Sequence, residues 1–320
     1  MAAEVTVATS TTNLGSWTNW ALTEVSTDFQ AGMIEFDDYS KKCAMDAMSA
    51  IYQLVQNTDK VDLGNLDTSN LRDIVKRCAS LKLSASAIPR EVYFHLRNKM
   101  INGQWVNEVE MGIEGDGNDA LLRNFGVGVD AVFPPWLVCE GDDFEYPKRK
   151  GMSVEPPSWT PKGLSSKVVR VVYPVRMKGN TEEYLIAERE GVRVNLMAHV
   201  RNNLMNETFG IVGKKRDANA DQSAAIKARK DEILNALRGC GTVDDMLKCD
   251  LARPYISPAW LDSSESMMVR KMRNNAIRKF PKSMNQIASS SLMEMDDVYV
   301  SSRAEIEENE NTEPFLIEGA

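Results

Sequence analysis

The chain has 320 residues, of which 43% are hydrophobic and 26% are charged, and its formal net charge is −8. That length and apolar content suffice to bury one large core or two small ones. No run of about 18 uninterrupted apolar residues occurs, and the N-terminal sequence MAAEVTVATSTTNLG lacks the basic and apolar regions of a signal peptide. We therefore expect a globular protein of the cytoplasm without a membrane span.

The charge is strongly segregated along the chain. Residues 1–147 carry 11 Lys and Arg against 22 Asp and Glu, residues 148–292 carry 26 against 15, and residues 293–320 carry 1 against 9. The low pI is therefore set by the two ends, and the segment between them is a cationic module that would attract a polyanion.

Cysteine usage argues against a disulfide framework or a structural zinc site. The five cysteines form no CxxC pair, and only two histidines are available to complete a metal site. We expect reduced, mostly buried thiols. The cysteines are Cys43, Cys78, Cys139, Cys240 and Cys249.

The first half of the chain predicts helices around a hairpin. Residues 1–40 are expected to be an extension anchored by a few aromatic side chains. Apolar residues at helical spacing predict amphipathic helices over 38–56 and 70–83, the second after the start signal Asp67-Thr68-Ser69. EVYFHL (91–96) and QWVNEVEMGI (104–113) predict a hairpin around Asn102-Gly103, followed by a turn in the Gly-rich residues 112–119, a helix in NDALLRNFG and a strand in WLVCEGDDFEY.

The second half predicts another hairpin and more helices. KVVRVVYPVRMK (167–178) predicts a strand with Arg170 and Arg176 on one face, and Pro174 suggests an edge or bulged position. TEEYLIA returns antiparallel after the Gly179-Asn180 turn. Helices are expected within 188–205 and, after a basic loop, within 213–238.

Residues 257–283, SPAWLDSSESMMVRKMRNNAIRKFPKS, predict a basic amphipathic helix. A capping box from Asp262 to Glu265 would begin it and Pro281 would end it. At 100° per residue, one arc is apolar and the opposite arc is cationic. The apolar arc comprises Met268, Val269, Met272, Ala276 and Phe280, and the cationic arc comprises Arg270, Lys271, Arg273 and Arg278.

Motifs for enzymatic chemistry are sparse. No GxxxxGK[ST] sequence occurs, so ATP-driven chemistry is not expected, and neither histidine lies in the context of a catalytic triad. Asp142, Asp143 and Glu145 near Lys148 could serve a metal-dependent nuclease. Strand alternation would send Asp142 to the opposite face from the other two, so an acidic strand end is the favoured interpretation. We predict no catalytic residue, no cofactor and no metal site.

Basic side chains form several clusters in the second half, with Trp159 and Trp260 nearby as stacking surfaces. Proteins that bind single strands combine a cationic groove, which neutralises phosphates, with aromatic rings on which bases stack. The predicted DNA contacts are Lys148, Arg149, Lys150, Lys167, Arg170, Arg176, Lys178, Arg193, Arg201, Trp260, Arg270, Lys271, Arg273, Arg278 and Lys279. The basic loop Lys214-Lys215-Arg216 adds to this charge.

Several segments, in order, resemble the RecT family of phage-type single-strand annealing proteins. They are LDTSNLRDIVKRCASLKLSASAIPREVYF, NDALLRNFGVGV with VCEGDDFEY, and SPAWLDSSESMMVRKMRNNAIRKFPKS, the most specific of the three. The resemblance covers about residues 45–205 and 255–297. The chain departs from the family over residues 195–256, where the family's connection is short.

The resemblance implies an α+β fold with a central β-hairpin or small antiparallel sheet packed with helices, as in the annealase core of RecT and Redβ. It implies an annealase domain over 41–292 containing an insertion at about 195–256, and an acidic tail at 293–320 that composition predicts to be disordered. The implied function is ATP-independent binding of single-stranded DNA and annealing of complementary strands during recombination, by an oligomeric ring or filament.

The partners implied by the resemblance are single-stranded DNA, the annealed duplex, other copies of the chain, an exonuclease and a single-strand-binding protein. Mg²⁺ would assist annealing without a protein site. Two alternatives remain open at this stage: the metal-dependent nuclease, and a structural oligomer that does not bind DNA.

Overall fold

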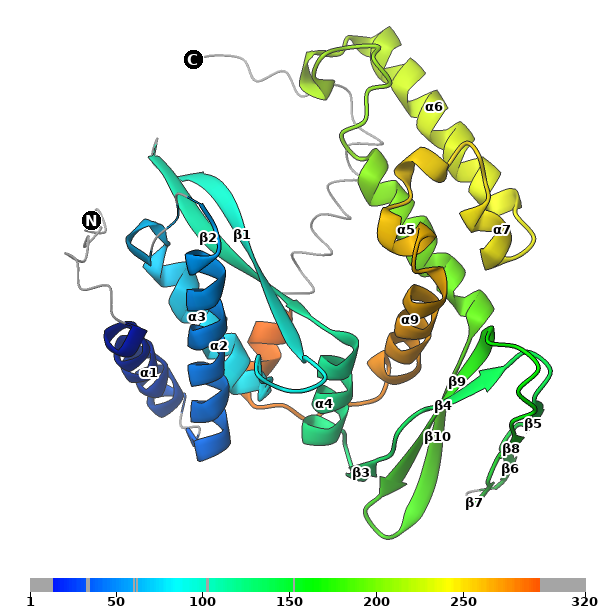
Figure 1. The fold of residues 1–320 in the computed structure, drawn as a ribbon, viewed down its shortest axis with the longest axis horizontal. Coiled ribbons are helices and arrows are strands. Elements are labelled where there is room, and N and C mark those ends of the chain that lie inside the picture. Colours follow the sequence, from blue (N-terminus) through cyan, green and yellow to red (C-terminus); the bar gives the residue numbers. More distant parts are fainter. Residues whose placement is uncertain are drawn as a thin grey trace. The chain divides into compact units, whose positions relative to one another are not determined.

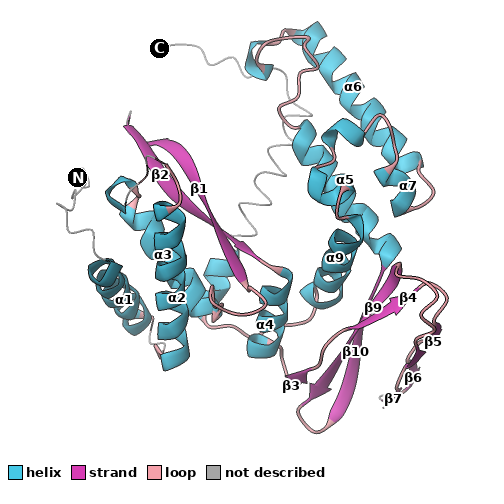
Figure 2. Cartoon of the chain, viewed as in Figure 1, coloured by secondary structure: helices cyan, strands magenta, loops and turns pink. Residues whose placement is uncertain are grey.

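The computed structural model describes residues 14–32, 35–59, 61, 63–101, 104–151 and 153–293 (Figure 1). The expected turn at residues 102–103, most of the expected acidic tail and residues 1–13 of the expected extension lie outside them. Helices and small antiparallel sheets make up the described chain (Figure 2), so the α+β class is confirmed. The chain divides into two compact units, described separately here: the first ends at Val132 and resumes at Phe280, and the second spans Phe133–Lys279.

Capping side chains fix where the helices of the first unit begin. The helices that precede the hairpin are α1 (Leu14–Ala31), α2 (Asp38–Gln56), the 3-10 turn η1 (Leu63–Asn65) and α3 (Thr68–Leu81). Asp37 accepts a hydrogen bond from the backbone N–H of Ser40 at 2.7 Å, and Asp67 accepts from the N–H groups of Ser69 and Asn70. Such bonds satisfy amide groups that have no partner within the helix. The start signal predicted at Asp67 is thus confirmed.

Helix α1 belongs to the core of the first unit. Ala21, Val25 and Phe29 are at most 1% exposed and pack in one cluster with residues of α2, α3 and the hairpin strand β2. The expected division between an extension and a domain at residue 40 therefore does not coincide with a boundary between compact units, because the aromatic anchors lie on a packed helix.

The predicted hairpin is confirmed: β1 (Val92–Ile101), which extends beyond the expected 91–96, pairs with β2 (Gln104–Ile113), with Ile101 opposite Gln104. The following helix α4 (Gly115–Phe125) begins inside the Gly-rich stretch that we expected to be a turn, so that expectation was wrong. A Cβ atom at Gly117 would lie 2.1 Å from the carbonyl oxygen of Glu91. Glycine at position 117 therefore lets the first turn of α4 pack closely against the backbone of Glu91. Strand β3 (Val129–Val132) ends this part of the unit.

The second unit contains a sheet whose central strand is β9 (Val168–Met177). It pairs antiparallel with β10 (Thr181–Glu188) on one side and with β4 (Trp136–Cys139) on the other. Of the edge or bulged position predicted from Pro174, the edge is therefore wrong, and the register shift between β9 and β4 falls at Val138 and Cys139 instead of at Pro174. Pro174 lies beyond Val172, the last residue of β9 that pairs with β4, so its missing N–H costs that pairing nothing.

A narrow ribbon of short strands follows β4. It consists of β5 (Asp143–Glu145) paired with β8 (Ser158–Thr160), and of β6 (Lys148–Lys150) paired with β7 (Ser153–Glu155). The single strand expected over 136–146 is thus two strands separated by a turn. Gly141, with φ of +90°, lies in that turn, in a conformation that favours glycine.

Helices complete the second unit, including the segment predicted to be an insertion. They are η2 (Arg189–Val192), α5 (Arg193–Leu204), η3 (Lys215–Asp217), α6 (Ala220–Gly239), α7 (Val243–Leu247), η4 (Arg253–Tyr255), α8 (Pro258–Leu261) and α9 (Ser264–Arg278). Leu196, Val200, Ile226 and Leu234 are at most 3% exposed. Residues 195–256 therefore contribute buried side chains to the unit instead of forming an appendage.

The basic helix α9 differs from its prediction at its start and on its packing face. Ser263 precedes the helix without a side-chain cap bond, and Glu265 instead accepts from the backbone N–H of Val168 at 2.6 Å. Met268 and Met272 are buried as predicted. The third buried residue is Ile277, which lay outside the predicted arc.

The five thiols are free, as expected. Only Cys43 and Cys78 are buried and the other three are partly exposed, so the expectation that most of the thiols are buried was wrong. Burial raises the pKa of Cys43 to about 12, so this thiol stays protonated at neutral pH. Among the described residues, no helix combines the length and apolarity needed to cross a membrane.

Candidate nucleic-acid interface

The sheet of the second unit has one face covered by a helix. Side chains alternate along β9, so Val171, Tyr173 and Val175 share a face. Helix α9 packs on β9 and β10, and the Tyr173 hydroxyl accepts a hydrogen bond from Nε of Arg273 at 2.8 Å. The opposite face carries Arg170, Val172, Pro174 and Arg176, together with the residues that pair with them.

The ribbon is attached to this opposite face through Trp159. The Asp142 carboxylate accepts hydrogen bonds from Trp159 Nε1 and from the N–H groups of Cys139 and Lys162, each at 2.9 Å. The bonds from Lys162, Trp159 and Cys139 lower the pKa of Asp142 below its usual 3.8. The Trp159 ring stacks on Trp136 of β4, with centroids 5.9 Å apart and planes inclined by 27°.

A second attachment of the ribbon is centred on Arg170. Its guanidinium lies 4.4 Å from the ring centroids of both Phe144 and Tyr146. Its Nε donates to Glu188 at 2.7 Å, and another nitrogen donates to the hydroxyl of Tyr146, which itself donates to Glu188. The Arg170 side chain is only 15% exposed. This predicted DNA contact is therefore used to hold the ribbon on the sheet.

The ribbon presents three consecutive cations, Lys148, Arg149 and Lys150, which we call the ribbon cations. All are exposed, and each faces a glutamate: Lys148–Glu145 at 3.7 Å, Arg149–Glu183 at 3.0 Å and Lys150–Glu155 at 3.5 Å. Exposed ion pairs contribute only about 0–1 kcal/mol. A phosphate can therefore replace each glutamate at little cost.

An aromatic groove of about 520 Å³ lies on the same face of the sheet. Phe133 is 43% exposed, and its backbone N–H donates to the carbonyl of Pro174 at 3.1 Å. The guanidinium of Arg176 lies 5.7 Å from the Phe133 ring centroid, and the rings of Trp136 and Tyr184 are 6.2 Å apart. The groove is lined by Phe133, Pro134, Pro135, Trp136, Pro174, Val175, Glu182 and Tyr184.

Four other predicted contacts lie elsewhere in the second unit. Arg193 donates to the carbonyls of Cys240 and Gly241 at 2.7 Å, so it closes the loop after α6. Arg201 is half-buried on α5. Trp260 is 2% exposed, so its ring offers no face to a base and the expectation that it stacks on DNA is corrected. Lys178 is exposed in the β9–β10 turn, where Gly179 and Asn180 have positive φ.

The cations of α9 do not form the open face that the helical arc predicted. Arg270, Lys271 and Arg273 are half-buried, and only Arg278 and Lys279 at the C-terminal end are exposed. Burial, with a smaller effect of the Arg270 charge, lowers the pKa of Lys271. The helix uses part of its charge to pack on the sheet.

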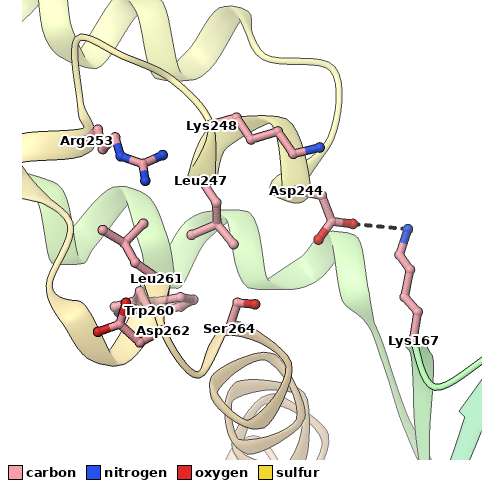
Figure 3. A pocket seen from close by; sticks show the side chains of 9 residues that line it. All are labelled: Lys167, Asp244, Leu247, Lys248, Arg253, Trp260, Leu261, Asp262 and Ser264. Atoms are coloured by element: carbon pink, nitrogen blue, oxygen red, sulfur yellow. Dashed lines mark ion pairs between the residues drawn. The ribbon is translucent and has the colours of Figure 1, made fainter.

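A second cavity, of about 470 Å³, lies between α7 and the start of α9 (Figure 3). Lys167, another predicted contact, forms an ion pair with Asp244 at 3.1 Å there, and the cations Lys248 and Arg253 line the same cavity. Asp262 lines it as well. The carboxylates of Asp244 and Asp262 therefore offset part of the positive charge of this cavity.

The carboxylates of the nuclease alternative are committed to local contacts. Asp142 caps the turn as described, Asp143 pairs with Lys162 at 2.6 Å, and Glu145 pairs with Lys148. Within the part of the chain that the structure describes, no group of three or more histidine, cysteine or acidic side chains is arranged to hold a metal ion. No observation therefore favours this alternative.

Comparison of the chain with models of known protein families, with curated proteins and with solved structures finds no significant match. The similarity to the RecT family stays a prediction that rests on the sequence motifs.

The sequence patterns did not predict that the residues of the aromatic groove form a binding site. Phe133, Trp136 and Tyr184 are far apart in the chain, and only the pairing of β4 and β10 with β9 brings them together. The available signal was the segment Phe-Pro-Pro-Trp at 133–136, where prolines next to large rings keep aromatic surface exposed at the start of a strand.

Proposed function

We propose that the protein binds single-stranded DNA and anneals complementary strands without ATP, as an annealase of the RecT type. The observation that carries this proposal is that the second unit combines three consecutive exposed ribbon cations with an open aromatic groove. Phosphate neutralisation and aromatic stacking are the two physical components of single-strand binding. The second unit also holds 25 Lys and Arg against 19 Asp and Glu, whereas the first unit, residues 1–132 with 280–293, holds 12 against 18.

Annealing needs no covalent step. Two complementary strands repel each other through their phosphates, and a cationic surface that neutralises one strand lowers the barrier to the approach of the second. Several copies of the chain, arranged as a ring or filament, would present a continuous cationic path and hold a strand extended. An exonuclease that exposes single strands and a single-strand-binding protein are the partners expected of such an activity.

The first experiment measures annealing of two complementary oligonucleotides, without ATP and with or without Mg²⁺, by wild-type protein and by two triple variants. The test variant replaces Lys148, Arg149 and Lys150 with Ala. The control replaces Lys227, Arg229 and Arg238, exposed cations of α6, and so changes the net charge equally.

We expect the wild type to anneal intact strands and the test variant to bind more weakly. Each single-strand phosphate contact contributes about −0.7 to the slope of log K against log salt, so losing three contacts flattens the slope by roughly 2. The control should keep both slope and annealing. Equal losses in the two variants would show that net charge alone governs binding, strand cleavage would support the nuclease, and no binding at all would support a structural oligomer.

A further inference from the structure

We propose that the aromatic groove is a nucleobase subsite, in which an unpaired base of the bound strand stacks against Phe133, beside the adjoining rings of Trp136 and Tyr184. This inference rests on the proposed function and adds to it. It assigns the bases to the groove and the phosphates to the ribbon cations and Arg176.

The groove has the shape and lining that a flat ring requires. Trp136 is already stacked on one side by Trp159, and its neighbour across the sheet, Tyr184, is inclined to it by 51°. Phe133 leaves 43% of its surface exposed, although an aromatic ring gains free energy from burial. Prolines at 134, 135 and 174 hold the backbone stiff, so little conformational entropy is lost when a ring enters.

The polar groups at the groove suit a nucleotide. Arg176, whose guanidinium lies 5.7 Å from the Phe133 ring centroid, supplies a cation that can bind a phosphate next to a base stacked on Phe133. Tyr184 donates a hydrogen bond to Glu182, and burial, together with the Glu182 charge, raises the pKa of Tyr184 to about 12. The phenol therefore stays neutral at physiological pH, and no phenolate repels the strand.

Stacking on the face of a base has a consequence for annealing. The Watson–Crick edge stays free to meet a complementary strand, because the protein contacts the ring planes and the phosphates. A duplex cannot fill the subsite without unstacking a base, which costs a few kcal/mol. The subsite therefore binds the unpaired strand more tightly than the duplex, and its affinity for the strand falls once pairing is complete.

A proline-rich peptide is the other ligand class that an aromatic groove can accept. The nucleobase is favoured because the groove shares its sheet face with Arg176 and lies in the cationic unit of the chain. The two classes are separated by the measurement that follows.

The experiment measures binding of full-length protein to three labelled probes of equal length by fluorescence anisotropy. The probes are oligo(dT), the same phosphate backbone with abasic spacers, and a proline-rich peptide. The variants are Phe133→Ala, Phe133→Trp and, as a control, Tyr39→Ala, which removes an aromatic ring of the same 43% exposure from the first unit. Circular dichroism verifies that each variant folds.

We expect wild type and Tyr39→Ala to bind oligo(dT) more tightly than the abasic backbone. Phe133→Ala should lose roughly 5- to 150-fold in affinity for oligo(dT), the range that corresponds to stacking of one base, and nothing for the abasic probe. Phe133→Trp should restore binding, which excludes a merely structural defect.

Two results would overturn the inference while the proposed function stands: equal binding of oligo(dT) and the abasic probe, or peptide binding that depends on Phe133 while DNA binding does not. Absence of binding to both DNA probes would overturn the proposed function, and the subsite with it.

Discussion

Arg170 and Arg149 illustrate how two arginines that both pair with a glutamate differ in what they do. Arg170 is 15% exposed, contacts two aromatic rings and bonds to Glu188, whereas the Arg149 side chain is 69% exposed and meets a single glutamate. A largely desolvated cation against aromatic rings contributes more than an exposed ion pair. Arg170 is therefore a positioning residue, and Arg149 is available to a ligand.

At this scale the two substitutions Arg170→Met and Arg149→Met should have opposite profiles. Arg170→Met is expected to lower the free energy of unfolding by about 2 kcal/mol, because it removes the cation that contacts the two rings and a charged hydrogen bond. Arg149→Met should change stability by less than about 0.5 kcal/mol and weaken DNA binding instead. Urea unfolding and limited proteolysis within residues 143–160 measure the first effect. Equal stability of the two variants would contradict the assignment of Arg170.

Residue roles were the part that the sequence predicted least well. Alternation along β9 correctly placed Arg170 and Arg176 on one face, but nothing in a strand pattern indicates that Phe144 and Tyr146 fold back over one of them. The same limit applies to Trp260. Its sequence context allows either a core residue or an exposed ring on which a base stacks, and the structure shows that it is buried. Burial and pairing are set by contacts distant in the chain.

At the scale of elements, the start of β9, the turn η2, helix α7 and the start of α9 are joined by one buried arginine. Arg189 has a side chain only 7% exposed and binds Asp244 at 2.8 Å, Glu265 at 2.9 Å and the carbonyl of Val168 at 2.9 Å. Lys167 adds a second cation to Asp244. Since the partners come from separate elements, the network fixes how these elements meet.

This network predicts a pH dependence of stability. Burial raises the pKa of Asp244, but the hydrogen bonds and charges of Arg189 and Lys167 outweigh it, so the folded-state pKa lies below 3.8. As pH falls, the unfolded chain takes up the proton first. The carboxylate therefore stabilises the fold fully above the unfolded-state pKa, and this contribution is lost as pH falls through the lower, folded-state value.

Asp244→Asn should destabilise the second unit by about 3 kcal/mol at pH 7, since it leaves a buried arginine with one carboxylate fewer. Asp250→Asn, the same change at an exposed site, is the control. Denaturant unfolding at pH 7 and at pH 3 should show the variant and the wild type converging in acid. A difference that persists undiminished below the folded-state pKa would be inconsistent with a role for the ionised carboxylate.

Elements were predicted well where local signals and packing agree. Helix α2 has the bounds that its apolar spacing indicated, and α3 begins after Asp67. The capping box expected at Asp262 did not form, because the Glu265 carboxylate instead accepts a hydrogen bond from the N–H of Val168 and forms an ion pair with Arg189. A local rule fails where a charged side chain has stronger tertiary partners.

At the scale of the whole molecule, the second unit is inserted into the first. The backbone N–H of Val127 donates to the carbonyl of Pro281 at 2.9 Å, and that of Ser283 donates to Phe125 at 2.8 Å. The two segments of the first unit that lead to and from the second unit thus run side by side. This arrangement explains why charge changes sign along the chain: the cationic stretch largely coincides with the inserted unit.

Because those two segments are adjacent, the units should be separable. Residues 133–279 expressed alone, and a chain in which a short Gly-Ser linker replaces them, are the two proteins to compare. We expect the isolated second unit to bind oligo(dT) with the salt dependence of the full chain, since the ribbon cations and the aromatic groove both lie within it. The linked first unit, with 12 Lys and Arg against 18 Asp and Glu, should not bind. Thermal melts followed by circular dichroism verify folding. If the folded first unit bound DNA and the folded second unit did not, the prediction that the DNA interface lies in the second unit would be wrong.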